Sequence, residues 1–533
     1  MSCSKIFSGD LPELTYEVIK YFQNDYSTLH SCILVNRLWC RLAIPLLWEN
    51  PFSIPTGNYN FIKIYSHNSN SDFKTKLIEY KIINSSSLPS NTLFNYPSLL
   101  KYLNINKIIF SVVRWFEATI RTSNTENGLN LGFNFNRDIC VSLFKIFIEN
   151  EVNLHTLEIE FSDVTHISTY FNNLNNICEL ILQNTNFIHN IRNINLFINN
   201  LFDSSYSDNN KYKLIENRIS QIINLQQNLK KILIGSNSFP LYQSLLLSKE
   251  SNCSNTLNTI TFYKINFNFS INNILEQLNV LESIHIIYCS FNSNFAQKII
   301  NLTKPFKLKS LLINEKPQIE VLGLLLQKYG DYLENFEYIF NHDLSLNQQL
   351  LEIIIKYCKN INFPCFNIYE RLITYQILNL IENIKQNLNY LSINIWYDYN
   401  GKGGSSTILQ NLGQILPSKL EYLLLGLHHI KADDFKVFLK NSHDTFIKKL
   451  LIYNSQGQDI LPLIKKYIMK KKRVRYLAIN NYFYESTFDR YGDNIKELIS
   501  LKDEVKEFRL YNIEVQSYSG LVIDMHNYIK EIN

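Results

Sequence analysis

Leu388-Asn389-Tyr390-Leu391-Ser392-Ile393 has the pattern L-x-x-L-x-L, in which x is a variable residue. Four other stretches have the same pattern, with Val or Ile in place of some leucines. These stretches are Leu154-His155-Thr156-Leu157-Glu158-Ile159, Leu281-Glu282-Ser283-Ile284-His285-Ile286, Leu308-Lys309-Ser310-Leu311-Leu312-Ile313 and Val474-Arg475-Tyr476-Leu477-Ala478-Ile479. A short apolar pattern that recurs at a regular period is the sequence signature of a solenoid, whose repeats bury their apolar residues against one another.

Strand-like stretches of this kind recur from Leu154 to the C-terminus. They begin at 154, 177, 229, 257, 281, 308, 333, 360, 388, 420, 447, 474 and 505. Intervals of roughly 24–32 residues match the longer leucine-rich repeats, which have room for a helix after each strand. Apolar residues at helical spacing follow many of the strands, at 274–278, 295–302, 319–329, 350–358, 372–384, 435–439 and 460–468. The sequence therefore predicts an α/β solenoid with a curved parallel sheet inside and helices outside.

Two parts of the array depart from the regular spacing. The interval from 177 to 229 is close to two periods, so 185–228 is expected to hold a degenerate repeat or a helical insertion. Asn and Pro interrupt the pattern at 360–367. Within a regular repeat, the first, fourth and sixth residues should point into the solenoid, and the alternating residues should lie on the concave face of the sheet.

Composition narrows the class of protein. The chain has 533 residues, of which 46% are hydrophobic and 19% are charged, so it can form a continuous core. The net charge is only +5, which does not favour nucleic acid or an acidic membrane surface as partner. The nine cysteines include no C-x-x-C pair, and no run of 18 apolar residues occurs. We expect a cytosolic or nuclear protein with reduced thiols and no cofactor or metal.

Signals for enzymatic activity are weak. Gly401-Lys402-Gly403-Gly404-Ser405-Ser406 lacks the order of a phosphate-binding loop and is expected to be a flexible loop between repeats. His428-His429 has no carboxylate or cysteine at metal-ligand spacing. The basic run Lys470-Lys471-Lys472-Arg473 fits the last turn of a helix, with a nuclear-import signal as the alternative. We therefore expect a protein without catalytic residues.

The N-terminal block at 10–48 shows three helical patterns. Asp10 could cap the first helix and Pro12 fits its first turn. Ser27 could cap a second helix, and a third short helix is predicted from Leu42 to Trp48. A unit of this size is close to the lower limit for independent stability, so it is expected to pack on a partner. Residues 56–153 hold further helical stretches, which we predict to be a linker that caps the N-terminal edge of the repeats.

The residues of the N-terminal block resemble the F-box family. The resemblance rests on Leu11-Pro12-Glu13-Leu14, Val18-Ile19-Lys20-Tyr21-Phe22, Leu29, Cys32, Val35-Asn36-Arg37-Leu38-Trp39 and Leu47-Trp48. Together with the repeats, the chain is similar to the F-box/leucine-rich-repeat proteins of fungal type, with an F-box at 1–55, the helical linker at 56–153 and repeats with a C-terminal cap at 154–533. In this chain Glu13 follows Pro12 directly, one residue earlier than in the commonest form of the motif.

The resemblance implies two binding partners. An F-box binds a Skp-type adaptor and, through it, a cullin scaffold, while the repeats hold a protein substrate for ubiquitin transfer. By position, the adaptor-binding residues would be Leu11, Pro12, Leu14, Ile19, Phe22, Leu29, Cys32, Val35, Asn36 and Trp39. The alternative is that the same side chains only form the core of the block itself. No membrane or nucleic acid is expected as a partner.

The concave face of the last repeats is rich in Tyr and polar residues, which are common at binding hot spots. The alternation of side chains predicts a substrate-binding surface formed by Tyr390, Asn394, Trp396, Tyr422, Lys449, Tyr453, Tyr476, Asn480, Arg509 and Tyr511. The 33 tyrosines of the chain offer a simpler explanation for this enrichment. The sequence thus predicts a substrate receptor of a ubiquitin ligase, with a leucine-rich-repeat scaffold or inhibitor with a degenerate F-box as the alternative.

Overall fold

A computed structural model describes most of the chain. The described residues are 11–23, 25–54, 59–67, 71–83, 92–120, 128–161, 167–198, 209–236, 238–247, 252–267, 272–290, 293–314, 318–340, 343–395, 403–482, 495–523 and 528. The chain forms two compact units. Unit 1 contains Met1–Asn258 and Gln277–Val280, and unit 2 contains Thr259–Glu276 and Leu281–Asn533.

Unit 1 begins with three helices, as the sequence predicts. They are α2 (Pro12–Lys20), α3 (Tyr26–Ile33) and α4 (Arg37–Trp48). The side chain of Asp25, rather than Ser27, caps α3, and Asn36 caps α4. The third helix therefore starts at Arg37 and not at Leu42. Asp10, the predicted cap of the first helix, lies outside the described residues, and Leu11 holds the N-cap position of α2.

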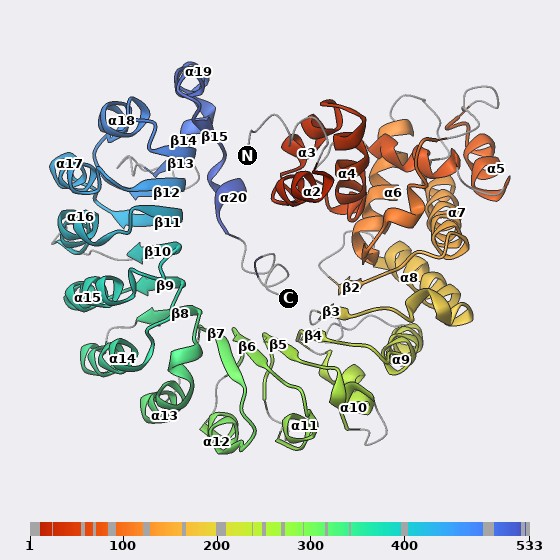
Figure 1. Cartoon of the computed structure of the whole chain (residues 1–533), viewed down its shortest axis with the longest axis horizontal. Helices are drawn as coiled ribbons and strands as arrows, with labels where there is room; N and C mark the ends of the chain where they lie inside the picture. Colours follow the sequence, from red (N-terminus) through yellow and green to blue (C-terminus); the bar gives the residue numbers. More distant parts are fainter. Residues whose placement is uncertain are drawn as a thin grey trace. The chain divides into compact units, whose positions relative to one another are not determined.

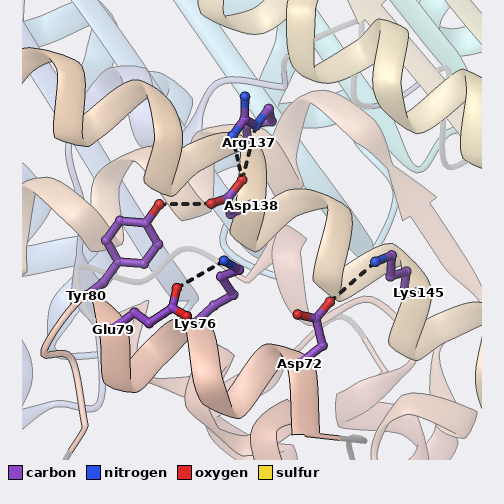
Figure 2. A network of polar contacts seen from close by, with 7 residues as sticks. All are labelled: Asp72, Lys76, Glu79, Tyr80, Arg137, Asp138 and Lys145. Carbon is purple, nitrogen blue, oxygen red and sulfur yellow. Dashed lines mark hydrogen bonds and ion pairs between the residues drawn. The ribbon is translucent and has the colours of Figure 1, made fainter.

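Further helices of unit 1 cover most of the predicted linker. They are η1 (Pro51–Ser53), η2 (Tyr59–His67), α5 (Ser71–Glu79), η3 (Pro97–Leu99), α6 (Ile105–Ile120) and α7 (Gly128–Glu149). Polar contacts join α5 to α7 (Figure 2). The Tyr80 hydroxyl donates to Asp138 at 2.9 Å, and Lys145 lies 3.3 Å from Asp72. Burial and the bond to Asp138 raise the pKa of Tyr80 to about 12, so its proton stays in this contact at neutral pH.

Unit 1 also contains the first parallel strands. Its strands are β1 (Tyr102–Asn104), β2 (Thr156–Phe161), β3 (Asn193–Ile198) and β4 (Lys231–Ile234). The helices after α7 are α8 (Ile167–Gln183), η4 (Thr185–Ile188), α9 (Asn209–Asn224), α10 (Phe239–Leu247) and η5 (Asn252–Asn255). The strand predicted from 177 is wrong, because Leu174, Ile177, Cys178 and Ile181 are buried at helical spacing on α8. The degenerate repeat expected at 185–228 is β3 with α9.

Unit 2 continues the alternation of strand and helix. Its elements are β5 (Thr259–Tyr263), α11 (Asn272–Gln277), β6 (Ser283–Ile287), α12 (Ser293–Asn301), β7 (Lys307–Ile313), α13 (Ile319–Tyr329), η6 (Gly330–Tyr332), β8 (Asn335–Phe340), α14 (Leu344–Tyr357), β9 (Phe363–Ile368), η7 (Arg371–Ile373), α15 (Thr374–Ile384), β10 (Tyr390–Ile395), α16 (Gly404–Ile415), β11 (Lys419–His428), α17 (Ala432–Asn441), β12 (Phe446–Ser455), α18 (Leu461–Ile464), the π-helix η8 (Lys465–Met469), β13 (Val474–Tyr482), β14 (Ile495–Glu497), η9 (Leu498–Ser500), α19 (Lys502–Leu510), β15 (Glu514–Val515) and α20 (Tyr518–Leu521). Strands β5 to β13 are parallel, and β13 also pairs with antiparallel β14 and parallel β15.

The repeated sequence pattern corresponds to stacked apolar side chains. Leu391 of β10 pairs with Leu423 of β11, which pairs with Leu450 of β12, and Leu450 pairs with Leu477 of β13. All four side chains are fully buried. In Figure 1 the strands of each unit form one layer, and the helices between them form a second layer on one side. The prediction of an α/β fold, with an N-terminal helical region and a leucine-rich-repeat-like solenoid, is therefore confirmed.

The last predicted strand, from 505, is wrong, since residues 502–510 form α19. This helix buries Phe508 and has acidic residues in its first turn, which suits a helix N-terminus. Among the described residues, no helix is both long and apolar enough to span a membrane.

Candidate protein-binding surfaces

The predicted adaptor-binding residues divide into two groups in the structure. Pro12, Leu14, Val35 and Asn36 are exposed, and Leu11 and Phe22 are half-buried. Ile19, Leu29, Cys32 and Trp39 are buried. The buried group forms one apolar cluster with Ala43 and Leu46. Four of the ten residues therefore hold the three helices together.

Trp39 is the largest of these buried side chains. Only 8% of its surface is exposed, and it is part of the core of α2–α4. Its backbone N–H is fixed as well, because it donates to the Asn36 side chain at 2.9 Å. Asn36 is thus exposed but already serves as the cap of α4. The burial of Trp39 agrees with the alternative, in which its side chain forms the core of the N-terminal block itself.

Helix α2 presents a row of apolar side chains that the predicted set includes only in part. Leu14, Val18 and Tyr21 are 46%, 43% and 81% exposed. Their spacing of four and three residues places them along one face of the helix. Leu34 and Val35, in the turn between α3 and α4, are 76% and 53% exposed. We call Leu14, Val18, Tyr21, Leu34 and Val35 the apolar surface of the N-terminal helices. Their helical spacing is the sequence signal that could have identified Val18 and Tyr21 as part of this surface.

The predicted substrate-binding residues of β10–β13 meet on one face of the sheet. Tyr390, Tyr422, Lys449 and Tyr476 are successive partners across these strands. A second row, four residues further along each strand, contains Asn394, Gly426, Tyr453 and Asn480. Because the buried leucines alternate with these residues, both rows lie on the face opposite the connecting helices. We call this surface of β8–β13 the tyrosine face.

The chain itself covers part of the tyrosine face. Residues 518–523 pack on it in an apolar cluster that contains Tyr422, Leu424, Leu451, Ala478 and Leu521. Figure 1 shows α20 beside β12 and β13, on the side away from α17 and α18. Tyr422 is only 1% exposed as a result, and burial raises its pKa. The chain's own segment thus covers Tyr422, one of the residues predicted to bind substrate.

Two predicted residues of this surface have other positions, and a third lies outside the described residues. Arg509 lies on α19 and Tyr511 in the turn after it, so neither belongs to a strand of the tyrosine face. The error has a physical cause, since the apolar residues of 505–513 have a helical spacing that also fits the short repeat pattern. Trp396 lies outside the described residues.

A polar chain continues the same face over β8–β10. Glu337 accepts hydrogen bonds from the Tyr288 hydroxyl at 2.5 Å and from the Asn367 amide at 3.1 Å. Asn394 in turn donates to Asn367 at 3.1 Å. Burial raises the pKa of Glu337, and its hydrogen bonds oppose this shift. These contacts satisfy polar groups inside the repeat array and need no catalytic role.

Other candidate sites have a structural explanation or lie outside the described residues. Arg473 is buried and donates to the backbone oxygens of Leu439, Ser442 and Thr445, so it is not part of an exposed basic run. Gly401 and Lys402 are outside the described residues, and Gly403 begins α16 with a positive φ of 101°. Within the described ranges, no group of three His, Cys, Asp or Glu side chains has the arrangement of a metal site.

Comparison of the chain with models of protein families and with curated proteins gave no match. The resemblance to the F-box family therefore rests on the residues quoted for it. The geometry adds two surfaces of different character, one exposed and apolar on α2–α4 and one aromatic and partly covered on β8–β13.

Proposed function

We propose that the chain is the substrate-recognition subunit of a Skp–cullin–F-box ubiquitin ligase. In this proposal the N-terminal helices bind the Skp-type adaptor and the repeats bind a protein substrate. The chain itself performs no chemistry. It brings substrate lysines close to a charged conjugating enzyme, which raises their effective concentration.

The observation that carries the proposal is the apolar surface of the N-terminal helices. Exposed Leu14, Val18 and Tyr21 follow one face of α2, whereas the core beneath them is already complete with Ile19 and Leu29. A small helical unit gains nothing for its own stability from such a surface. Exposed apolar patches of this kind mark interfaces. The parallel repeats that follow fit a second binding role, since solenoids offer long surfaces for partners.

The proposal is tested by binding of a purified Skp-type adaptor to the full chain. Val18→Asp with Tyr21→Asp should reduce adaptor affinity by about two to four orders of magnitude, because each of the two lost apolar contacts is worth about 1.5–3 kcal/mol. Helical content should stay unchanged, since both side chains are exposed. The matched control is Tyr375→Asp on α15, since this tyrosine is also largely exposed (67%) and lies far along the chain.

An unchanged affinity of the double variant would show that this surface is not the adaptor interface. A wild-type chain that does not bind the adaptor at all would favour the alternative function, a repeat scaffold or inhibitor outside ubiquitin transfer. Capture of substrate can be measured separately by immunoprecipitation with the proteasome blocked.

A further inference from the structure

The segment that covers the tyrosine face makes a specific set of contacts with it. The Tyr422 hydroxyl accepts a hydrogen bond from the backbone N–H of Ile523 at 3.4 Å. Tyr528 donates to the side-chain oxygen of Asn335 at 2.7 Å. The ring of Tyr528 lies 5.1 Å from that of Phe363 and 6.2 Å from that of Tyr390. Residues 518–523 thus cover β11–β13, and Tyr528 lies over β8–β10.

Aromatic and aliphatic groups supply most of the remaining contact. Tyr518 packs on Tyr453 with ring centroids 6.0 Å apart. Between the two tyrosines of the segment, Leu521 is buried against Leu424 and Leu451. The site therefore holds one aliphatic side chain between two aromatic ones, and Tyr422 and Asn335 provide hydrogen-bond partners for the bound segment. Large aromatic side chains with a polar end are the groups that contribute most at protein interfaces.

The segment can leave this position without breaking the sheet. The backbone N–H groups of Leu521 and Val522 donate to Ser517 and Tyr518, within the segment itself. Those of Tyr518 and Ile523 donate to the side chains of Glu497 and Tyr422. None of these four bonds belongs to a strand ladder. Segments held mainly by side chains open at lower free energy than strands of the core.

We propose that the tyrosine face is a receptor site for a short protein segment with an aromatic–aliphatic–aromatic pattern, and that Tyr518, Leu521 and Tyr528 of the chain itself fill this site in cis. The proposal rests on the proposed function, in which the repeats bind a protein substrate, and it gives the chemistry of the segment that is recognised. A partner must displace the chain's own segment, so its apparent affinity equals the intrinsic affinity multiplied by the fraction of time that the site is free.

The test uses the full chain and a fluorescent synthetic peptide with the sequence of residues 516–533. Leu521→Asp in the chain places a charge in the apolar cluster and should free the site. The peptide should then bind the Leu521→Asp chain at least tenfold more tightly than the wild-type chain. Adding Tyr422→Ala to Leu521→Asp should remove this binding, whereas adding Tyr375→Ala should not. A peptide with Tyr518, Leu521 and Tyr528 all changed to Ala serves as the control ligand.

Three outcomes would overturn the proposal. They are equal binding to the wild-type and Leu521→Asp chains, no binding to the Leu521→Asp chain, and binding that does not depend on Tyr422. Light scattering of the wild-type chain gives a further check, because a dimer that dissociates on Leu521→Asp would place the segment on a second copy. Circular dichroism verifies that each variant is folded.

The peptide assay contains no adaptor, so its result is separate from that of the proposed function. If the peptide binds but the adaptor does not, the result supports the receptor site and contradicts the ligase role. Adaptor binding without peptide binding would keep the ligase role and reject this receptor site.

Discussion

The N-terminal helices and the last repeats differ in whether their apolar surface is exposed. Helix α2 leaves Leu14, Val18 and Tyr21 in contact with solvent, although its own core is complete. On the tyrosine face, Tyr422 and Leu424 are covered by residues 518–523. Ile523 of this segment lies 101 residues further along the chain than Tyr422. The apolar surface on α2 is thus open to solvent, whereas the apolar surface on the sheet is covered by the chain itself.

The comparison also shows which side chains hold each region together. In the N-terminal helices, large residues such as Trp39 fill a small core. In the repeats, ladders of leucine and isoleucine recur from strand to strand, so each repeat depends on its neighbours. Four predictions test this difference, beginning with the largest expected effect.

Trp39→Ala should destabilise the N-terminal helices by about 3–5 kcal/mol, because it leaves a large cavity in a small core. Hydrogen exchange of amides in α2–α4 should become much faster, while exchange in β10–β13 should not change. Val35→Ala is the control, since Val35 is exposed and its loss should cost less than about 0.5 kcal/mol. Normal protection combined with lost adaptor binding would instead assign Trp39 to the interface.

Gly413→Ala should destabilise the repeats by about 1–3 kcal/mol, as expected for overpacking. A Cβ atom at Gly413 of α16 would lie 2.7 Å from the backbone oxygen of Phe438 on α17. The control is Gly404→Ala in the same helix, where the nearest atom would lie at an ordinary 3.5 Å. Thermal unfolding of both variants measures the difference. Equal melting temperatures would show that α16 and α17 are less closely packed than the structure shows.

Asn36→Ala should cost about 1 kcal/mol, since it removes the cap of α4. Asn36→Asp should restore most of the stability, because Asp is an equally good cap. The measurement is hydrogen exchange in the first turn of α4, together with adaptor binding. If Asn36→Asp is stable but binds the adaptor weakly, the amide also contacts the adaptor, as the sequence predicted.

Glu337→Gln should have the smallest effect, and its sign should depend on pH. Burial raises the pKa of Glu337 above its ordinary value of 4.5, so ionisation opposes folding. The protonated side chain stabilises the fold below pH 4.5, and this contribution is lost as the pH rises through the raised pKa. The Gln variant should therefore gain in melting temperature relative to wild type at pH 8 and lose this advantage near pH 4. If the difference in melting temperature between the two proteins is the same at pH 4 and pH 8, the pKa of Glu337 is not raised.

Local patterns predicted much of the fold because each repeat is built from contacts within one period. The repeat pattern at Leu388–Ile393 overlaps β10, in which Leu391 and Ile393 are buried, as expected. The same local rule failed at 177 and 505, where a few apolar residues fit both a helix and a strand. It also missed β3, although Ile191-Arg192-Asn193-Ile194-Asn195-Leu196 has the repeat pattern.

The sequence by itself determined which residues form strands, helices and the apolar ladders, since side-chain period and turn residues act over short distances. It also determined the residue types that the two candidate surfaces present. Only the tertiary structure decided that Trp39 is buried while Tyr21 is exposed, because three helices must pack before one of their faces is covered. Only the tertiary structure placed Leu521 and Tyr528 on the tyrosine face, because no local pattern encodes a contact between residues so far apart in the chain.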